Sequence, residues 1–487
     1  MVQFWYSLLA LMIVLLVWKW KRPRNFPPGP WALPILGNFL QVDFRNPMTD
    51  LEKIAKKYGN IFSIYMGSNP VVILHGYKTV KEALVDYAIE FADRPNDPLF
   101  FAMSNDKGIA FAPYGEQWKE KRRFMTMLLR NFGMGKTSME SRIQEELKCL
   151  MKCFDDKEGC SFQPQEMLRN AAGNAICAVL FGRRFDYSEK KFNRLIQLAV
   201  DLTKNISGIW GELYRAFPVI GHLPLPCQSI FTTLSKLKCF LMEIVEEHKK
   251  TMKPGEPRDC IDCYLEEMKK RQNTGSSIDD ESLIPIFLEL FVAGFDTTAN
   301  TLEWALLFMM TYPHIQENCY KEIKLVIDEK KEVTYEDRHK MPYIQAVTHE
   351  IQRFGTVFPL GVPHDVTKET TFLGYTIPKG IRVMANLSSV LFDESQWKFP
   401  HEFNPKNFLS DEGEFMKPDA FLPFSAGPRV CMGENLARMQ LFLFFTSIIQ
   451  RYEIVWPEKN KSPDLTPRFG LTQCPISFNV LLKHRRC

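Results

Sequence analysis

The first 24 residues limit the possible folds of this chain most strongly, because a short apolar segment there is followed at once by a basic cluster. An uncharged, mostly apolar run covers residues 2–18, and four basic residues come directly after it: Lys19, Lys21, Arg22 and Arg24. A secretory signal peptide has the opposite order, with basic residues first and a cleavage site of small residues last. We therefore predict that residues 1–20 are a membrane anchor and not a signal that is removed.

The flanking charges also predict an orientation. At roughly 1.5 Å per residue the run spans somewhat less than the ~30 Å hydrocarbon core, and the indoles of Trp18 and Trp20 suit the interface. Basic flanks stay on the cytosolic side. The expectation is a single-pass protein with a luminal N-terminus and a cytosolic body; a buried core helix is the alternative, which the basic cluster disfavours.

Length and composition favour one large folded domain, or a fused pair, after the anchor. The chain has 487 residues, of which 45% are hydrophobic and 24% are charged, so a large core is available. A net charge of +4 on this length, with no run that alternates basic and aromatic residues, argues against nucleic acid as a partner.

The twelve cysteines show no disulfide framework. The close pairs are Cys149 with Cys153 and Cys260 with Cys263, and no second CxxC or histidine pair follows at zinc-finger spacing. We predict reduced, unbridged thiols, as a cytosolic body would have; a role of the Cys260/Cys263 pair in metal or redox chemistry is left open.

Secondary-structure signals predict a mainly α protein with a small β portion. The basic, proline-rich residues 21–38 predict a stiff spacer, followed by the domain itself at 39–487. Asn46 before Pro47, with Gly59 beyond, predicts a helix, and "IFSIYMGSNPVVILHG" predicts two strands. Helical patterns dominate from Tyr77 onward. A hairpin is expected around 378–380, and "KKRQNTGSSIDDES" predicts a loop.

One cysteine stands in an unusual place. The stretch "FSAGPRVCMGENLAR" sets Cys431 in a short loop punctuated by Gly427 and Gly433, with Arg429 two residues before it and an apolar helix after it. The loop holds a thiol outside regular structure and beside a cation.

A second constellation interrupts the apolar helix "ELFVAGFDTTANTLEWALLFMM". Asp296 and Thr297 lie in its middle, where a buried polar group without a partner costs about 1–3 kcal/mol. A threonine hydroxyl can bond the carbonyl four residues back, here that of Ala293, and open a groove for water or a small ligand. A polar kink without any ligand is the alternative.

Two further pairs share helix faces. Glu350 and Arg353 stand at i, i+3, within ion-pair reach, and Trp118 and Arg122 stand at i, i+4, where an indole N–H and a guanidinium suit a carboxylate. A solvated surface pair and a cation stacked on an aromatic ring are the respective alternatives.

Together these motifs resemble the cytochromes P450, and "LGVPHDVTK" and "FLPFSAGPRVC" look most similar to microsomal family 2. The resemblance covers essentially the whole chain and rests on motifs in the family's order: the N-terminal anchor with "PPGP", Trp118-x-x-x-Arg122, Ala293-Gly294-x-Asp296-Thr297-Thr298, Glu350-x-x-Arg353 and Phe424-x-x-Gly427-x-Arg429-x-Cys431-x-Gly433. It implies the P450 fold and a haem b group.

The resemblance assigns the site residues. Cys431 would be the thiolate ligand of the haem iron, in the loop that Phe424, Gly427 and Gly433 shape. The haem propionates would be held by Arg429, Trp118, Arg122, His364 and Arg94. Ala293 would overlie the ring, while Thr297 and Asp296 would organise water for proton delivery. Phe111, Ala293, Thr297, Val362 and Leu471 would line the substrate pocket, although each is equally interpretable as core packing.

Two features are specific to this chain. The family's usual third partner of the Glu350/Arg353 pair is an arginine, and here "FNPKNFL" offers Asn407; we expect the fold to survive with an amide there, and Glu350 and Arg353 to be structural. Lys119, Lys121 and Arg123 would lie near the proximal side, where cations suit docking of an acidic reductase.

The implied function is reductase-dependent monooxygenation on the cytosolic face of the endoplasmic reticulum. Electrons would come from NADPH through a separate reductase, because no dinucleotide fingerprint or flavin domain is present in the chain. Cytochrome b5 is a further possible partner. Lipophilic substrates such as fatty acids (arachidonate among them), steroids or xenobiotics would be hydroxylated, epoxidised or dealkylated with O2. The alternatives are a haem-thiolate isomerase and a non-enzymatic membrane-bound haem or lipid carrier; the Asp296-Thr297 pair argues against both.

Overall fold

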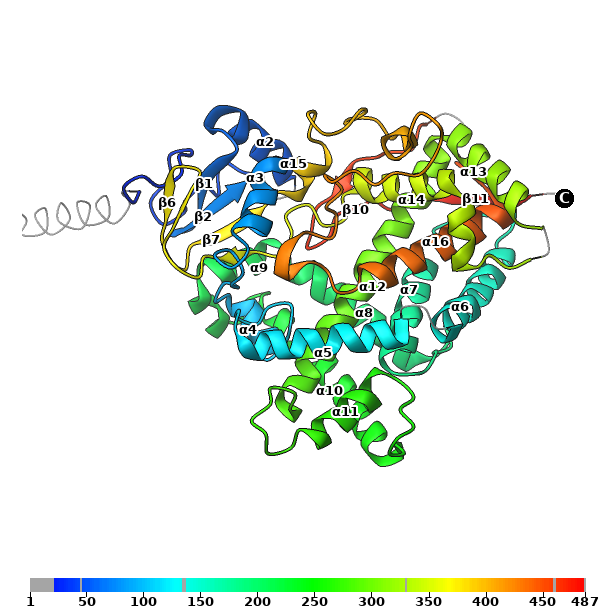
Figure 1. Cartoon of the computed structure of the whole chain (residues 1–487), viewed down its shortest axis with the longest axis horizontal. Coiled ribbons are helices and arrows are strands. Elements are labelled where there is room, and N and C mark those ends of the chain that lie inside the picture. Colours follow the sequence, from blue (N-terminus) through cyan, green and yellow to red (C-terminus); the bar gives the residue numbers. More distant parts are fainter. Residues whose placement is uncertain (1–21, 44–45, 134–136, 329–330, 459–460, 486–487) are drawn as a thin grey trace, which may run out of the picture.

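The protein divides into a large helical part and a smaller β-rich part (Figure 1). The computed structural model describes residues 22–43, 46–133, 137–328, 331–458 and 461–485. The predicted anchor, residues 1–20, lies outside these residues. The helical part is built around one buried apolar cluster, and two smaller clusters lie on the faces of the main sheet. This arrangement confirms the predicted mainly α architecture with a small β portion.

The helices are α2 (Pro47–Tyr58), α3 (Tyr77–Lys81), α4 (Pro98–Ser104), α5 (Glu116–Gly133), α6 (Thr137–Asp155), α7 (Gln165–Leu180), α8 (Lys190–Ile206), α9 (Ile209–Ala216), α10 (Gln228–Thr251), α11 (Cys260–Lys270), α12 (Asp280–Thr311), α13 (Pro313–Val326), α14 (Pro342–Gly355), α15 (Leu387–Leu391) and α16 (Glu434–Arg451). Short π or 3₁₀ turns are η1 (Glu82–Asp86), η2 (Pro218–His222), η3 (Tyr335–Lys340), η4 (Pro405–Phe408) and η5 (Gly427–Arg429). The strands are β1 (Ile61–Met66), β2 (Asn69–Leu74), β3 (Ser161–Phe162), β4 (His364–Asp365), β5 (Thr370–Phe372), β6 (Tyr375–Ile377), β7 (Arg382–Ala385), β8 (Tyr452–Val455), β9 (Pro467–Arg468), β10 (Cys474–Pro475) and β11 (Val480–His484).

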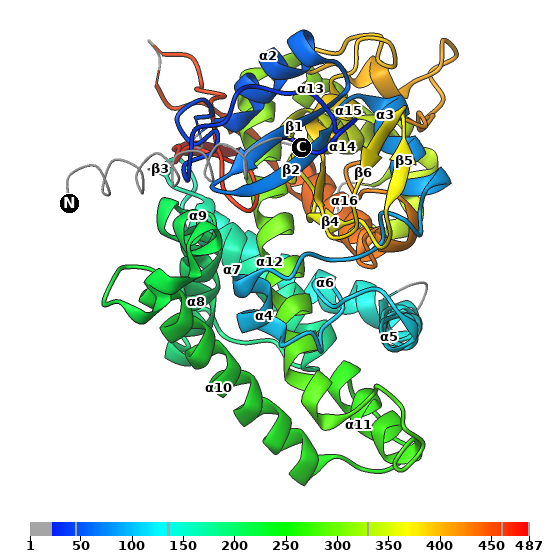
Figure 2. The same ribbon diagram turned by 90° about the vertical axis from the view of Figure 1, so that its left-hand side faces the viewer.

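Helix α12 is the central element of the helical part. Its 32 residues begin after Asp279, whose side chain accepts a hydrogen bond from the N–H of Ser282 as an N-cap, and end where Pro313 follows. It packs against α7, α14 and α16, while α10 and α11 lie together at one of its ends (Figure 2). Among the described helices, α12 alone is long and apolar enough to cross a membrane, yet 61% of its most apolar window is buried in the protein, as expected of a core helix.

The main sheet has the strand order β1-β2-β7-β4. β1 and β2 form the predicted hairpin, in which Gly67 has a φ of +61° that favours glycine. β2 pairs in parallel with β7, and β7 pairs with β4, where His364 lies opposite Val383. This pairing joins residues from the first and last thirds of the chain and fixes the position of His364.

The prediction of a hairpin around residues 378–380 was wrong, because β6, which precedes this turn, pairs with β5 and not with β7. The tight turn lies instead at Leu373 and Gly374, whose φ values are +47° and +80°, and it joins β5 to β6. Two successive positive φ values are typical of the two-residue turns that match the twist of a hairpin. β7, which follows 378–380, pairs with β2 and β4.

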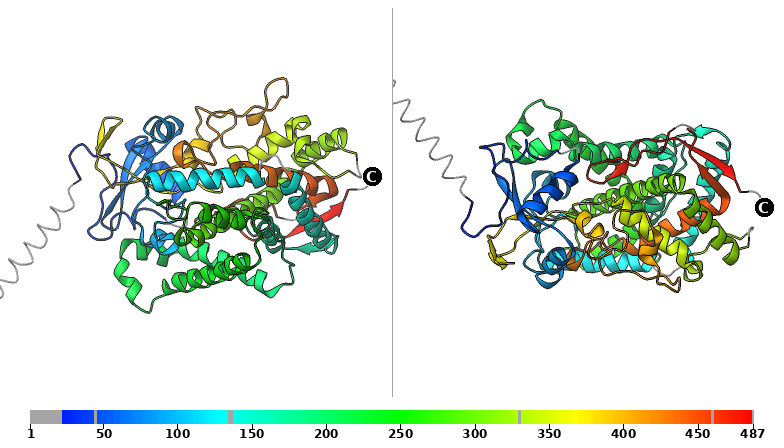
Figure 3. Two further views of the ribbon diagram at one scale, coloured as in Figure 1. Left: turned by 60° about the horizontal axis from the view of Figure 1, so that its bottom comes forward. Right: turned by 90° about the horizontal axis from the view of Figure 1, so that it is seen from above.

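The proline-rich segment lies against the sheet from Arg22 onward. The Ser63 N–H donates to Pro28 O at 2.7 Å, and a Cβ on Gly29 would lie 1.9 Å from Ser63 O. At the opposite end of the molecule, β11 lies beside β8 and near α6 (Figure 3).

Candidate functional site

The Cys431 loop, which lies between η5 and α16, is held by close backbone contacts to Phe424 and Leu84. The Cys431 N–H donates to Phe424 O at 3.0 Å. Gly427 has a φ of +70°, and a Cβ there would lie 1.9 Å from Leu84 O, so only glycine fits the position. Gly433 is the N-cap residue of α16. The loop therefore presents Cys431 at the start of a helix, as the sequence predicted.

The groups around the Cys431 thiol act on its pKa in both directions. Burial among protein atoms and the charge of Glu434 raise the pKa, while hydrogen bonds from the backbone N–H groups of Gly433 and Glu434 and the charge of Arg122 act to lower it; the net shift is upward. The side chain is nevertheless exposed, although Arg429 in the same loop is buried. An accessible sulfur with N–H donors aimed at it suits a soft metal ion as partner.

Trp118 and Arg429 meet beside this loop. Trp118 Nε1 donates to Ile109 O at 3.0 Å, and Arg429 Nη1 donates to the same carbonyl at 3.1 Å. The Arg429 guanidinium also lies 4.1 Å from the centroid of the Trp118 ring. Arg122, one turn after Trp118 on α5, donates to Val430 O next to the cysteine. Three of the predicted anion-binding residues, Trp118, Arg122 and Arg429, thus lie in or beside the cysteine loop.

The guanidiniums form a buried cluster of like charge. Arg94 donates to Ala110 O and Pro363 O, both at 2.8 Å. Burial, Arg429 and Arg122 hold the pKa of Arg94 well below its usual value, and burial lowers the pKa of Arg429 to about 9. Asp93 and Glu289 offset only part of this charge. A buried cationic cluster of this kind would be stabilised by an anion with two carboxylates.

His364 joins the cluster from β4. Its Nδ1 lies 2.6 Å from Phe91 O, which assigns the ring proton to Nδ1. Burial and the charges of Arg94 and Arg429 lower the pKa of His364 well below its usual value, so the imidazole is neutral. A carboxylate placed at Nε2 would raise this pKa and could then accept a hydrogen bond from the imidazolium.

On α12 the predicted hydroxyl contact is present. Thr297 Oγ1 donates to Ala293 O at 2.7 Å, and Ala293 is exposed although its neighbour Val292 is buried. Asp296, beside Thr297, accepts a hydrogen bond from Thr472 Oγ1 at 2.5 Å. Burial raises the pKa of Asp296. The middle of the core helix therefore carries an accessible small residue beside an acid and an alcohol.

The comparisons with known proteins agree with this geometry. Residues 27–481 match the family described as Cytochrome P450. The chain is 41% identical over 475 residues to Cytochrome P450 2J5 of Mus musculus, covering 97% of this chain and 94% of that protein. It is 42% identical over 471 residues to Cytochrome P450 2J2 of Homo sapiens (96% and 92%) and 43% identical over 464 residues to Cytochrome P450 2F2 of Mus musculus (95% and 94%).

The chain belongs to the cytochrome P450 family. Its relatives are microsomal family 2 members, and the family implies haem and O2. The described residues fit haem on two observations: an accessible thiol with backbone donors, and a buried cationic cluster able to receive two carboxylates.

The remaining predicted pocket residues of this P450 are only partly accessible. Phe111 stacks on Phe100 with ring centroids 4.1 Å apart, and Val362 gives its carbonyl to Arg94 at 3.2 Å. Leu471 precedes Thr472, the partner of Asp296. Each lies close to a residue of the cluster or of α12.

The Glu350/Arg353 pair of this P450 is a fully buried, bidentate ion pair. Arg353 Nε and Nη2 each lie 2.7 Å from a Glu350 oxygen, and the guanidinium also donates to the carbonyls of Leu391 and Glu402. Asn407 Nδ2 donates to Glu350 Oε1 at 3.2 Å and to Phe399 O at 3.0 Å. The Asn407 amide thus hydrogen-bonds the Glu350 carboxylate at the position where the family usually has an arginine.

One predicted surface residue is buried. Lys121 is 2% exposed and its Nζ donates to Lys107 O at 2.8 Å, so it is not part of an exposed docking surface. Arg123 is exposed, and Lys119 is exposed beside Glu116. The helical pattern gave no indication of which lysine faces inward, because the groups around Lys121, including Lys107 and Glu289, come from other parts of the chain.

Other predictions concern cysteines and pockets. The eleven cysteines of the described residues are free, including Cys260 and Cys263.

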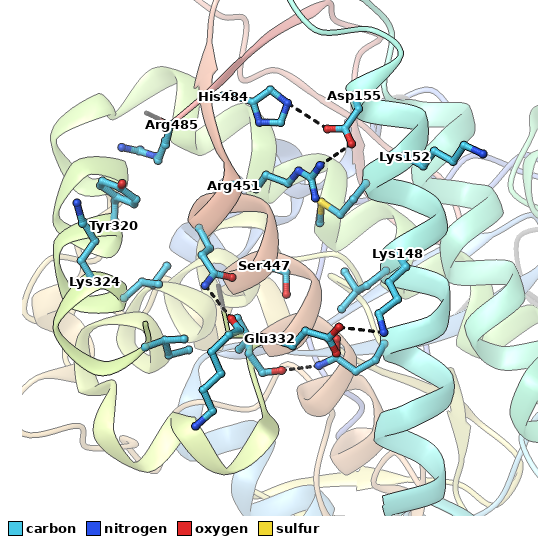
Figure 4. A pocket seen from close by; sticks show the side chains of 18 residues that line it. Lys148, Lys152, Asp155, Tyr320, Lys324, Glu332, Ser447, Arg451, His484 and Arg485 are labelled. Carbon is cyan, nitrogen blue, oxygen red and sulfur yellow. Dashed lines mark hydrogen bonds and ion pairs between the residues drawn. The ribbon is translucent and has the colours of Figure 1, made fainter. Parts of the chain in front are cut away.

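A pocket of about 480 Å³ lies between α6, α13 and α16 and contains none of the predicted site residues (Figure 4). Its lining includes Lys148, Lys152, Lys324, Arg451 and Arg485.

Sequence reasoning missed two buried carboxylates on α12. Glu289 accepts hydrogen bonds from the N–H groups of Ile109 and Ala110 at 2.6 and 2.8 Å, which fixes the segment that Trp118 and Arg429 grip. Glu303 is 1% exposed and lies 3.0 Å from Arg169. A carboxylate inside an apolar helical run is the signal that could have indicated both.

Proposed function

We propose that this P450 is a membrane-anchored haem-thiolate monooxygenase that takes electrons from NADPH through a partner reductase. The observation that carries the proposal is the accessible Cys431 thiol with N–H groups of Gly433 and Glu434 directed at it, beside a buried cluster of guanidiniums. When bound, a thiolate-ligated haem iron supplies dioxygen activation for insertion of one oxygen atom into a substrate.

Separate residues of the chain would bind the haem propionates and the haem iron. Arg429, Arg122, Arg94, Trp118 and His364 would hold the propionates, and an anion there would offset the mutual repulsion of the guanidiniums. Cys431 would be the axial ligand, while the N–H groups at its sulfur would tune the iron's potential.

Asp296 and Thr297 would move protons during the reaction. Thr297 Oγ1 is hydrogen-bonded to Ala293 O, so its oxygen remains able to accept a hydrogen bond from water. Burial raises the pKa of Asp296, which favours its uptake of a proton more than in a solvated aspartate.

The substrate would be a lipophilic small molecule, such as a fatty acid, steroid or xenobiotic. Phe111, Val362, Leu471 and Ala293 would line its pocket with apolar surface. Residues 1–20 would anchor the protein in the endoplasmic reticulum, residues 21–38 would link the anchor to the body, and residues 39–487 would form the cytosolic catalytic domain.

The test is the absorption spectrum of the reduced protein with carbon monoxide, combined with reductase-dependent turnover. We expect a strongly red-shifted Soret band in the wild type that is lost in Cys431→Ser. We also expect product formation only with NADPH and reductase. A histidine-type band would contradict the ligand assignment, and product from a peroxide substrate without reductase would favour an isomerase.

A further inference from the structure

A second acid lies two turns from Asp296 on the same face of α12. Glu303 follows Asp296 by seven residues, which corresponds to about 10.5 Å along the helix and nearly two full turns. Asn300 stands between the two acids, four residues after Asp296 and three before Glu303. The three polar side chains thus form a line along an otherwise apolar helix.

Hydrogen bonds join the first half of this line. Thr472 Oγ1 donates to Asp296 Oδ2 at 2.5 Å, and Asn300 Nδ2 donates to Thr472 Oγ1 at 2.8 Å. Asn300 Nδ2 also lies 3.4 Å from Asp296 Oδ2. The loop between β9 and β10, which contributes Thr472, covers this face of α12 and separates it from solvent.

The second half of the line opens into a pocket. A pocket of about 310 Å³ is lined by Gln163, Gln165, Glu166, Arg169, Glu303, Arg468, Pro475 and Ser477. Among the described residues, Glu303 Oε1 and Gln165 Oε1 are buried oxygens left without a hydrogen bond of good geometry, although Arg169 Nη2 is in ion-pair contact with Glu303. Two such acceptors beside two guanidiniums, in a space larger than the ~30 Å³ that a water molecule occupies, make a site suited to ordered water.

We propose that Glu303 passes protons between the water in this pocket and Asp296, and so acts on the reaction through Asp296 as a positioning residue. This inference rests on the proposed monooxygenase function. A water proton passes to the Glu303 carboxylate, and Glu303 releases a proton through water held near Asn300 to Asp296, which hands it on toward Thr297. The pocket water regains its proton from bulk solvent, and no electrons move along this path.

The charges around Glu303 support such exchange. Burial raises the pKa of Glu303 to about 7; Arg169 and Arg468 act to lower it, and Asp296 acts to raise it. Cys474 is hydrogen-bonded by Arg468 Nη2 at 3.3 Å, and Glu166 stands exposed at the pocket. An acid with this pKa exchanges protons in both directions near neutral pH.

The first experiment measures protonation without turnover. In the carbon monoxide complex of the reduced holoenzyme, the infrared carbonyl band of protonated carboxylic acids is titrated between pH 5 and 9. We expect one component of this band to titrate near neutral pH, to be lost in Glu303→Gln and to titrate at lower pH in Asp296→Asn, since the Asp296 charge disfavours ionisation of Glu303. Components from Glu146 and Asp365, whose pKa values burial also raises to about 7, should remain in both variants. The exposed Glu453→Gln should leave the band unchanged.

The second experiment measures coupling, as product formed per NADPH consumed. We expect Glu303→Gln to lower this ratio several-fold with excess hydrogen peroxide, to flatten its pH dependence near neutrality and to leave substrate affinity unchanged, while Glu303→Asp restores part of the loss. Ser477→Trp, which fills the pocket from an exposed position without altering α12, should also lower coupling.

Unchanged coupling and an unchanged pH profile in both Glu303→Gln and Ser477→Trp would overturn the inference. If Glu303→Gln does not fold, Ser477→Trp and the wild-type titration still decide it. Failure of the proposed function has a different signature: the wild type itself would lack the thiolate-type Soret band or reductase-dependent product.

Discussion

Trp118 and Arg429 donate hydrogen bonds to one carbonyl, that of Ile109, at 3.0 and 3.1 Å. This shared acceptor ties α5 and the cysteine loop to the same point of the chain. Glu289 holds the preceding peptide, because its carboxylate accepts the N–H of Ile109 at 2.6 Å. Side chains from three separate segments therefore meet at the backbone of Ile109.

Replacing Trp118 by phenylalanine should weaken haem retention more than it weakens the fold. The change removes one N–H donor, and a hydrogen bond of this kind contributes about 0.5–1.5 kcal/mol, or roughly 2- to 12-fold in an equilibrium. We expect faster haem loss to apomyoglobin by about that factor. Trp397→Phe is the control, since Trp397 Nε1 donates to Val390 O at 2.9 Å in the β-rich part; equal haem loss from both variants would contradict a specific role.

The Glu350/Arg353 ion pair should be among the most sensitive positions for stability. Removing one partner of a buried pair leaves an uncompensated charge and costs about 3–5 kcal/mol. We expect Arg353→Met to give a large loss of thermal stability or no folded protein. Arg451→Met, whose half-exposed pair with Asp155 spans 2.6 Å, should cost less than about 1 kcal/mol. Similar melting temperatures for the two variants would be inconsistent with this account.

Asn407 should contribute measurably where the family usually has an arginine. Its amide bonds Glu350 and Phe399, and Asn407→Leu would leave those buried acceptors with fewer donors, at a cost of about 1–3 kcal/mol. Thermal unfolding of the holoenzyme measures this loss. A melting temperature equal to that of the wild type would show that the amide is dispensable.

Thr297 should affect coupling rather than substrate binding. In Thr297→Ala the hydroxyl that is proposed to order water is absent, so we expect several-fold less product per NADPH and more hydrogen peroxide. Thr301→Ala is a matched control, because Thr301 Oγ1 also bonds the carbonyl four residues back, Thr297 O, at 2.7 Å. Equal uncoupling in both variants would point to helix distortion and not to proton delivery.

The contact between His248 and Asp259 should make stability depend on pH. Their Nε2 and Oδ2 atoms lie 2.8 Å apart, joining the end of α10 to the start of α11. Burial lowers the pKa of His248, but the hydrogen bond and charge of Asp259 outweigh it and the net shift is upward. The stabilisation is therefore full below the unfolded histidine's pKa, near 6.5, and is lost as pH rises through the folded value.

We expect His248→Gln to lose about 1.5–3 kcal/mol relative to the wild type at pH 6, with a smaller difference at pH 9. Thermal unfolding across this range measures it, with the exposed His339→Gln as control. A difference that grows with pH would reverse the assigned sign.

The local features of this protein follow from the order of its residues alone. Cys431 between two glycines, Thr297 four residues after Ala293, the β1–β2 hairpin and the helix after Asn46 all depend on residues close together in the chain. Their backbone conformations and i, i+4 contacts follow from short-range sterics and hydrogen bonding, which the order of residues specifies directly.

Which helix and sheet faces are buried, and which segments cover them, depends on tertiary packing. The spacing of Lys119, Lys121 and Arg123 did not reveal that Lys121 faces inward, because the covering residues come from distant parts of the chain. β7 pairs with a strand about 300 residues earlier, so the hairpin could not be placed from its turn residues alone. The burial of Glu303 beside a pocket follows from the packing of α7 and the β9–β10 loop over it, because burial and its effect on pKa are properties of packing and not of sequence spacing.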